Sequence, residues 1–142
     1  MPASVLRVKY TFIAQAKANI PLLPVRLISP DGSVLEKLAL VDSGAQCSVL
    51  PRQLGDALGL DWDSCRQLPN IGGALSACRV KLALIYVGVS RWEPIEIGFA
   101  WAENDFPPLI LGQSNFFDHF RICFSKAALA FDIRPDKPKA NP

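Results

Sequence analysis

Apolar residues occur in this chain as short runs separated by proline and glycine, and this pattern constrains the fold more than any other feature. Every second residue from Leu6 to Phe12 is apolar, whereas the residues between them are basic or polar. Alternation with a period of two is typical of a strand that is buried on one face. We therefore expect a strand over 6–12 and a fold built mainly from strands.

Two further apolar runs, 22–28 and 34–41, flank the turn sequence Pro30-Asp31-Gly32. Proline fixes its own backbone torsion and glycine is permissive, so this sequence favours a tight reversal. The pattern predicts a hairpin that ends at Val41.

The rest of the chain continues in the same way. Pro51 suits the first turn of a helix and Gly59 suits its end, so a short helix is expected over 52–58. The other expected elements are strands at 76–87, 91–101 and 108–111, a helix at 114–120, and a hairpin of 121–124 with 128–133. We interpret residues 1–134 as a single domain and the proline-rich, charged residues 135–142 as a disordered tail.

Charge and hydropathy exclude several classes of function. The 142 residues include 15 Lys and Arg and 13 Asp and Glu, which give a net charge of +2. The charges are scattered, so we expect no surface for nucleic acid or an anionic membrane. The longest uncharged stretches, 67–78 and 106–117, are shorter than the about 20 apolar residues of a membrane-spanning helix. Because no continuous apolar block follows the N-terminal basic residues, we expect no secretory signal and place the protein in the cytoplasm.

The thiols and the histidine suggest no reactive centre. The cysteines show no C-x-x-C pairing; they are Cys47, Cys65, Cys78 and Cys123. Cysteine is often buried as a small apolar residue, so core packing is the simpler interpretation. His119 is the only histidine, so a zinc site would need several distant cysteines. We interpret His119 as structural and predict neither a metal nor a cofactor.

One segment does not read as ordinary packing: an apolar strand, 38–41, runs directly into Asp42, Ser43, Gly44 and Ala45. Asp-Ser-Gly is common turn chemistry, so a structural turn is one interpretation. A carboxylate at the end of a buried strand is also a candidate catalytic group. A second segment helps to distinguish these interpretations, because the apolar strand 108–111 ends in Gly112 and leads into a short helix.

These two segments, in this order and with Gly72-Gly73 between them, resemble the retropepsin-like aspartic proteases, which are single-domain, dimeric relatives of the pepsins. The likeness covers about 34–133, and Leu111 to Phe124 is more similar to cellular and bacterial members than to viral ones. The resemblance implies a mostly β fold with a closed barrel and one or two short helices, which is half of a two-fold symmetric pepsin-like architecture.

The resemblance also implies roles for individual residues. Asp42 matches the catalytic aspartate, and Ser43 matches the position that hydrogen-bonds across the dimer axis. Gly44 and Ala45 leave room for the substrate backbone. Ile71, Gly72 and Gly73 match the tip of a flap that covers an extended peptide, although a Gly-Gly surface turn is an equally simple interpretation.

The chemistry explains why such a site needs two chains. Hydrolysis of an amide needs one group that takes a proton from water and another that gives a proton. A single Asp42 cannot do both at once. Two Asp42 carboxylates within about 3 Å of each other would share one proton, so that one acts as base and the other as acid.

The chain departs from the family pattern at two matching positions. Viral members carry an Asp and an Arg there, which form a charged support beside the site, and this chain has Gln46 and Gln113. We predict that the two glutamine side chains lie side by side and exchange amide hydrogen bonds as a neutral support.

The sequence supports one leading hypothesis and two alternatives. The leading hypothesis is an aspartic endopeptidase that cleaves polypeptides as a homodimer, through a water between two Asp42 carboxylates. One alternative is a dimeric peptide-binding or scaffolding module with the same fold, which the glutamines at 46 and 113 would suit. The other is a small β-barrel in which the Asp-Ser-Gly turn is coincidental.

Overall fold

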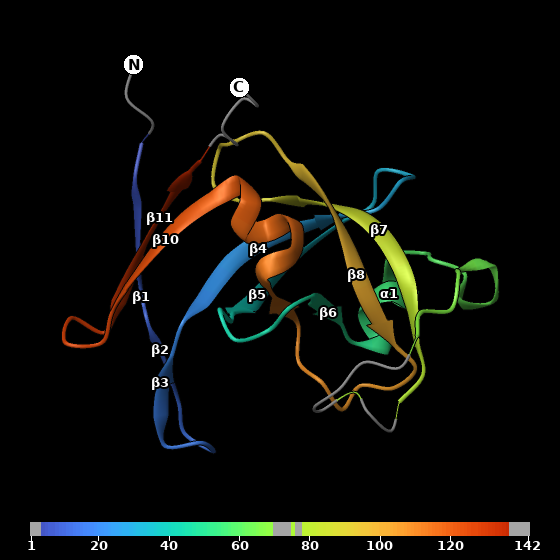
Figure 1. Ribbon diagram of the computed structural model, residues 1–142, viewed down its shortest axis with the longest axis horizontal. Coiled ribbons are helices and arrows are strands. Elements are labelled where there is room, and N and C mark those ends of the chain that lie inside the picture. The colour runs from blue at the N-terminus through green and yellow to red at the C-terminus, as the bar shows by residue number, and fades with distance from the viewer. Residues whose placement is uncertain (1–3, 70–74, 76–77, 137–142) are drawn as a thin grey trace.

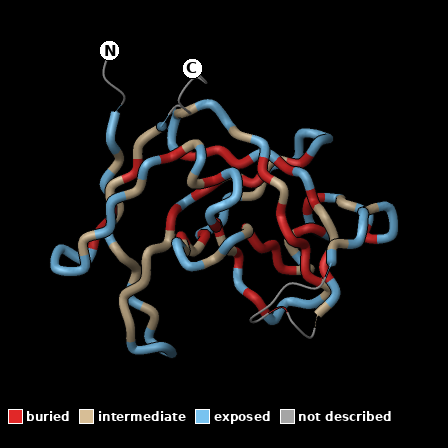
Figure 2. The backbone as a smooth tube through the Cα atoms, in the orientation of Figure 1, coloured by how far each residue is buried: buried red, intermediate tan, exposed pale blue. Residues whose placement is uncertain are grey.

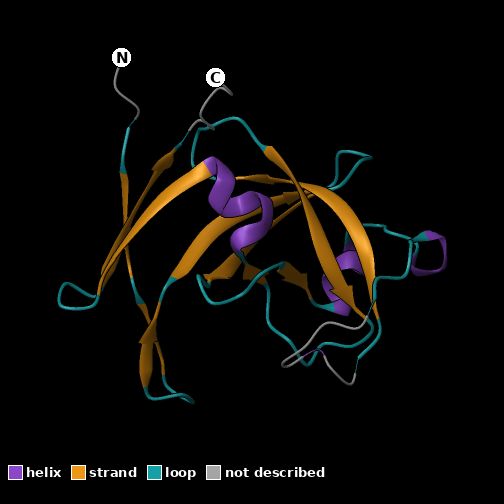
Figure 3. Ribbon diagram, viewed as in Figure 1, coloured by secondary structure: helices purple, strands orange, loops and turns teal. Residues whose placement is uncertain are grey.

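The computed structural model describes residues 4–69, 75 and 78–136, and strands predominate among them (Figures 1 and 3). A closed barrel has the strand order β4-β5-β9-β6-β8-β7. The bounds of these strands are Leu22–Ile28 (β4), Val34–Val41 (β5), Ser48–Leu50 (β6), Val80–Gly88 (β7), Ile95–Ala102 (β8) and Ile110–Leu111 (β9). The predicted mostly β fold with a closed barrel is confirmed.

The predicted hairpin before Asp42 is confirmed as β4 and β5, which pair antiparallel from Leu22–Leu40 to Ile28–Val34. Its turn is closed by main-chain bonds from Ser29 N to Ser33 O at 2.9 Å and from Gly32 N to Ser29 O at 3.0 Å. Gly32 has a φ of +92°, a conformation that favours glycine. The turn chemistry in the sequence therefore sets the register of the strand that carries Asp42.

Large apolar side chains fill the barrel, and Leu27, Ile85, Phe99 and Trp101 are fully buried. Buried residues are concentrated along the barrel strands (Figure 2). The predicted helix is observed as α1 (Arg52–Ala57), and Gly59 follows it with a φ of +78°. Helix α1 packs on Trp101 of β8, whose Nε1 donates to Arg52 O at 3.1 Å. The contact depends on Gly55, because a Cβ there would lie 2.1 Å from Trp101 Cε2.

Outside the barrel, the two ends of the described chain meet in an antiparallel sheet of order β1-β11-β10. These strands are Leu6–Lys9 (β1), Phe120–Ser125 (β10) and Ala130–Pro135 (β11). Arg7 Nε on β1 donates to Asp132 Oδ1 on β11 at 2.8 Å, and this bond lowers the pKa of Asp132. The predicted C-terminal hairpin is therefore present, and the N-terminal strand pairs with it.

The single strand expected over 6–12 is wrong, because the chain changes partner at Tyr10. Tyr10 N donates to Leu129 O at 2.7 Å at the end of the β1–β11 pairing. The following residues form β2 (Thr11–Ile13), which pairs with β3 (Ala18–Ile20) in a separate hairpin. The turn between them contains neither Gly nor Pro, and Lys17 takes a φ of 48°, so the sequence carries no signal for β3.

The helix expected over 114–120 also differs from the structure. The segment η3 (Gln113–Phe117) is kinked, with extended backbone at Ser114 and a φ of 67° at Asn115, and β10 begins at Phe120. Asn115 is held at the kink by bonds to two neighbours: its N–H donates to Asp118 Oδ2, and its side-chain amide donates to Glu96 O. Regular helix is therefore impossible over the first residues of the segment.

The remaining differences are smaller. Strand β6 and the short helical turn η1 (Trp62–Ser64) were not expected. Strand β7 begins at Val80, and residues 76 and 77 of the expected strand lie outside the described residues. Pro135 ends β11 instead of starting the tail, and residues 137–142 lie outside the described residues.

The cysteines are free thiols, and core packing holds for only part of the set. Cys47, Cys65 and Cys78 are half-buried against the two apolar clusters, whereas Cys123 is exposed on β10.

His119 Nδ1 lies 2.7 Å from Asn115 O. Since a carbonyl only accepts, Nδ1 carries the proton, and His119 has the structural role expected of it. None of the helices in the described part of the chain is both long and apolar enough to cross a membrane.

The β4–β5 turn makes the stability dependent on pH. Asp31 accepts hydrogen bonds from the Ser29 hydroxyl and from Ser33 N, and these bonds lower the pKa of Asp31 from 3.8 to about 2. A carboxyl with a depressed pKa stabilises the fold above its unfolded value, and this stability is lost as the pH falls through the folded value. We expect Asp31→Asn to reduce the fall in the urea midpoint between about pH 4 and pH 2. The exposed Asp63, changed to Asn, is the matched control; equal slopes in the two variants would contradict the role of Asp31.

Candidate active site

The candidate site lies where β5 ends, and it is built on the pairing of β5 with β9. The two strands run parallel, with Leu40 opposite Ile110 and Val41 opposite Leu111. Asp42 N donates to Leu111 O at 3.0 Å and so continues this ladder one residue beyond the strand. On its other side β9 is antiparallel to β6, so β9 lies between the strands that precede and follow the Asp42 loop.

The loop closes on itself immediately after Asp42. Ala45 N donates to Asp42 O at 3.2 Å, and Gly44 N donates to the side-chain oxygen Oδ1 of Asp42 at 2.9 Å. Asp42 is half-exposed, and Ser43 and Gly44 are exposed. A Cβ at Gly44 would lie 3.3 Å from Asp42 Oδ1, so glycine leaves room for the carboxylate. The turn thus fixes one carboxylate oxygen and presents the group at the surface.

Gly112 is the point of closest packing beneath the loop. A Cβ there would lie 2.5 Å from Cys47 O and 2.8 Å from Ala45 O, which are main-chain atoms that cannot rotate away. Gly112 N donates to the hydroxyl of Ser48 at 3.0 Å, and Ser48 is fully buried. Glycine is therefore required here for close approach and not for its torsion angles.

The loop is bonded to the same segment again beyond Gly112. Gln113 N donates to Ala45 O at 2.9 Å and Ser114 N donates to Gln46 O at 2.8 Å. The side chain of Gln113 also takes part, because its Nε2 donates to Ser43 O at 2.6 Å. The residues on both sides of Gly112 therefore hold the Asp42 loop through the main chain.

The predicted amide exchange between Gln46 and Gln113 is wrong in its partner. No hydrogen bond joins these two side chains within the described residues, and Gln113 donates to the Ser43 carbonyl instead. Gln46 takes part through its main-chain carbonyl. A carbonyl at the tip of a tight turn points away from the turn and needs a donor, and Gln113 supplies one.

The structure brings Asp42, Ser43, Gly44, Ala45, Gln46 and Gln113 together in one loop and its support. The other predicted substrate-binding residues, Ile71, Gly72 and Gly73, lie outside the described residues. Next to them, Leu75 is buried and packs with Val49 of β6 and Val80 of β7.

Two residues that support the site were missed in the sequence analysis. Ser48 supports Gly112 from the buried side, and its signal was available, because a serine between apolar residues of a buried strand must find a hydrogen-bond partner. Pro21 was also missed: its carbonyl accepts from Val41 N at 3.0 Å, beside Asp42, and it has no distinctive sequence signal.

The described residues support neither a nucleophilic cysteine nor a metal site at the Asp42 loop. Burial raises the pKa of the Cys47 thiol, whereas a nucleophilic cysteine needs a lowered value. Over residues 4–69, 75 and 78–136, no three His, Cys, Asp or Glu side chains are grouped closely enough to hold a metal ion. The ion pairs of the described chain also lie elsewhere, so Asp42 has no basic partner among them.

Comparison with known proteins finds one matching family model and several similar structures. A family model described as aspartyl protease matches residues 28–115, which include the Asp42 loop and Gly112. The chain is similar to a retropepsin-like aspartic protease from Rickettsia conorii, with a TM-score of 0.63 and 12% identity over 94% of each chain. It is also similar to the EIAV protease solved with an inhibitor, with a TM-score of 0.54 and 23% identity over 70% of this chain and 86% of that one. None of the curated protein sequences matches significantly.

The packing at Gly112 yields a direct test. We expect Gly112→Ala to lower the free energy of unfolding by about 1–3 kcal/mol, because the new methyl group displaces the main chain of the Asp42 loop. Gly98→Ala on β8 is the matched control, since a Cβ there meets only the ends of the Leu82 and Leu84 side chains, at 3.2 and 3.5 Å. Both variants change glycine to alanine, so the effect on the unfolded chain is similar. Urea titration of the two variants measures the difference; similar midpoints would contradict the proposed constraint.

Proposed function

Because the chain belongs to the aspartyl protease family and has the retropepsin-like fold, we propose that it is an aspartic endopeptidase that works as a homodimer. Asp42 of each subunit supplies one of the two catalytic carboxylates. The substrate is an extended polypeptide that lies across both Asp42 loops. The reaction needs neither a metal nor a cofactor.

The observation that carries the proposal is the state of the Asp42 carboxylate. It is half-exposed at the end of a rigid ladder, and Gly44 N is its one hydrogen-bond partner in the described chain. A carboxylate that is fixed in position and partly exposed is accessible to a second group from outside the chain. Since one carboxylate cannot act as acid and base together, a second copy of Asp42 is the natural partner.

The chemistry follows from the pair. Two carboxylates a few ångströms apart hold one proton between them, because both charges together are unfavourable. The ionised copy takes a proton from a water, whose oxygen attacks the carbonyl carbon of the peptide. The protonated copy gives its proton to the carbonyl oxygen, so that a tetrahedral intermediate with two hydroxyl groups forms. The first copy then gives the proton that it took from the water to the nitrogen, the C–N bond breaks, and one hydroxyl proton returns to the second copy, which restores the single proton of the pair. The products are a carboxyl group and an amine.

The neighbours of Asp42 have supporting roles in this proposal. The Ser43 side chain hydrogen-bonds to the partner loop in this proposal, which its exposure and the Gln113 bond to its carbonyl support. Gly44 and Ala45 form a small floor for the substrate backbone. The role that the sequence resemblance implies for residues 71–73, covering an extended peptide, also belongs to this proposal.

A dimeric peptide-binding module with the same fold is the alternative. The loss of the charged support favours it only if the loop is left loose. Gln113 replaces that support with a 2.6 Å bond to Ser43 O, and this favours catalysis over binding alone. Cleavage of an unfolded protein at mildly acidic pH separates the two functions, because a binding module would retain the polypeptide intact.

We expect Asp42→Asn to lower the rate of peptide hydrolysis at least about a hundredfold, because an amide cannot act as a base. The fold and the dimer should be kept, since asparagine has nearly the same shape and the change removes a like-charge contact. The measurement is cleavage of an unfolded protein, with circular dichroism as the check on folding. Asp63→Asn, which also exchanges one exposed carboxylate for an amide, serves as the control. Parental turnover in the Asp42 variant would refute the mechanism.

Mixing the parent chain with Asp42→Asn tests whether each site is shared. If subunits exchange freely, a ninefold excess of variant leaves about one parent chain in ten paired with another parent chain. We expect the activity per parent chain to fall to roughly that fraction. A site contained in one chain would instead give activity proportional to the parent chain present. That proportional result, after subunit exchange has been demonstrated, would exclude the paired mechanism.

A further inference from the structure

The β2–β3 hairpin lacks the support that the rest of the fold has. It forms a two-stranded sheet of its own and projects from the body of the molecule (Figure 1). No residue from Ser4 to Leu22 is buried, in contrast to the barrel strands (Figure 2). Because an isolated two-stranded hairpin is at best marginally stable in water, this one needs a further contact.

The hairpin has few charges and exposes apolar side chains. Lys17 is the only charged residue between Tyr10 and Val25. Phe12 is 61% exposed on one face, and Ile13 and Ile20 are only half-buried on the other. Apolar side chains on both faces of a projecting element are available to a protein that covers it.

The base of the hairpin, where β3 ends, lies beside the candidate active site. The residue that follows β3 is Pro21, and its carbonyl accepts from Val41 N at 3.0 Å. Val41 is the residue before Asp42, so one hydrogen bond separates the base of the hairpin from the catalytic loop. With a strand rise of about 3.3 Å per residue, the hairpin reaches roughly 15 Å from that base.

We propose that the β2–β3 hairpin is a dimerisation arm that packs on a second copy of this chain. The proposal rests on the homodimer proposed above. If two Asp42 carboxylates meet at a two-fold axis, the base of each hairpin lies beside that axis and its outer part extends along the partner. The symmetry then makes the contact twice, once for each arm. The second copy is the occupant because its Asp42 must approach this same place.

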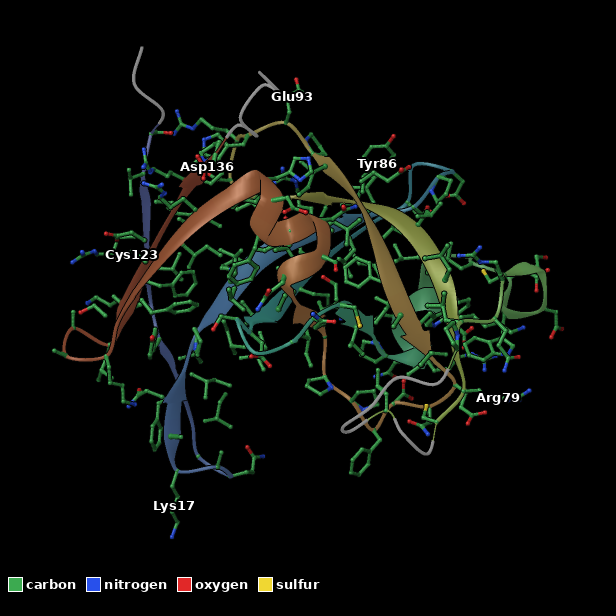
Figure 4. The ribbon with its side chains drawn as sticks, in the orientation of Figure 1. Lys17, Arg79, Tyr86, Glu93, Cys123 and Asp136 are labelled. Carbon is green, nitrogen blue, oxygen red and sulfur yellow. The ribbon has the colours of Figure 1, made fainter. Side chains whose placement is uncertain are left out.

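Each arm would contact the partner chain only in the dimer, at a place separate from the Asp42 loop. Phe12 is its anchor, because a large exposed aromatic side chain loses the most water when a partner covers it. Tyr86 provides a matched comparison: it is an aromatic residue, 44% exposed, and lies at the opposite end of the molecule from Lys17 at the tip of the hairpin (Figure 4).

The first experiment compares Phe12→Ser with Tyr86→Ser by sedimentation over a range of protein concentrations. We expect Phe12→Ser to raise the dimer dissociation constant at least about tenfold and Tyr86→Ser to leave it unchanged. Circular dichroism checks that both variants are folded. An unchanged dissociation constant in Phe12→Ser would overturn the arm and leave the dimeric protease standing.

The second experiment keeps an aromatic side chain at the position and so does not depend on the stability of Phe12→Ser. The photoreactive residue p-benzoyl-phenylalanine replaces Phe12 in one sample and Tyr86 in another. Irradiation should yield a covalent species of twice the chain mass of 15.5 kDa only from position 12. A sample that sediments as a dimer without crosslinking at position 12 would overturn the arm alone. A parent chain that stays monomeric at every concentration would overturn the arm and the proposed function together.

Discussion

The site depends on one short piece of pairing, the parallel contact between β5 and β9. Strand β9 has only two residues, yet it lies between β5 and β6 and so joins the two sides of the Asp42 loop. The bond from Asp42 N to Leu111 O extends this ladder into the loop, and Gly112 allows the loop to lie directly on the chain beneath it. A carboxylate on a free loop would move through many positions. Here the backbone that carries it is bonded on both sides, so the position is set before any partner or substrate arrives.

Local sequence signals predicted the parts of the fold that local chemistry determines. The hairpin of β4 and β5 was predicted because Gly32 supplies the positive φ its turn requires, and α1 ends as expected because Gly59 does the same. The elements that were missed depend on distant partners. Strand β6 forms only because β8 and β9 lie on either side of it, and β2 leaves β1 because the pairing with β11 ends at Tyr10. Neither pairing leaves a mark in the sequence of the strand itself.

The same division applies to the site. Asp42 and Gly112 were recognised from motifs, and the structure places them in one arrangement. The role of Gln113 was predicted only in outline: its amide supports the loop, but through the Ser43 carbonyl and not through Gln46. Side-chain partners depend on angles of a few degrees at the end of a ladder, and a pattern of residue types does not contain those angles. Ser48 was missed for a different reason: a serine among apolar residues signals that a partner is needed, but the sequence does not show that the partner is Gly112 N.

The neutral support has a physical consequence for a protease that works with one proton on two carboxylates. Such a pair is active only over the acid range in which it holds that single proton. A supporting ion pair that contains a carboxylate weakens in this range as the carboxylate is protonated. The Gln113 amide has no proton to gain or lose there, so its bond to Ser43 O persists as the pH falls. The contribution of the Asp31 carboxylate to the fold, by contrast, declines as the pH falls from about 4 toward its folded pKa of about 2. The Gln113 bond is therefore independent of pH through the range in which the proposed pair would be singly protonated, whereas the contribution of Asp31 to the β4–β5 turn is not.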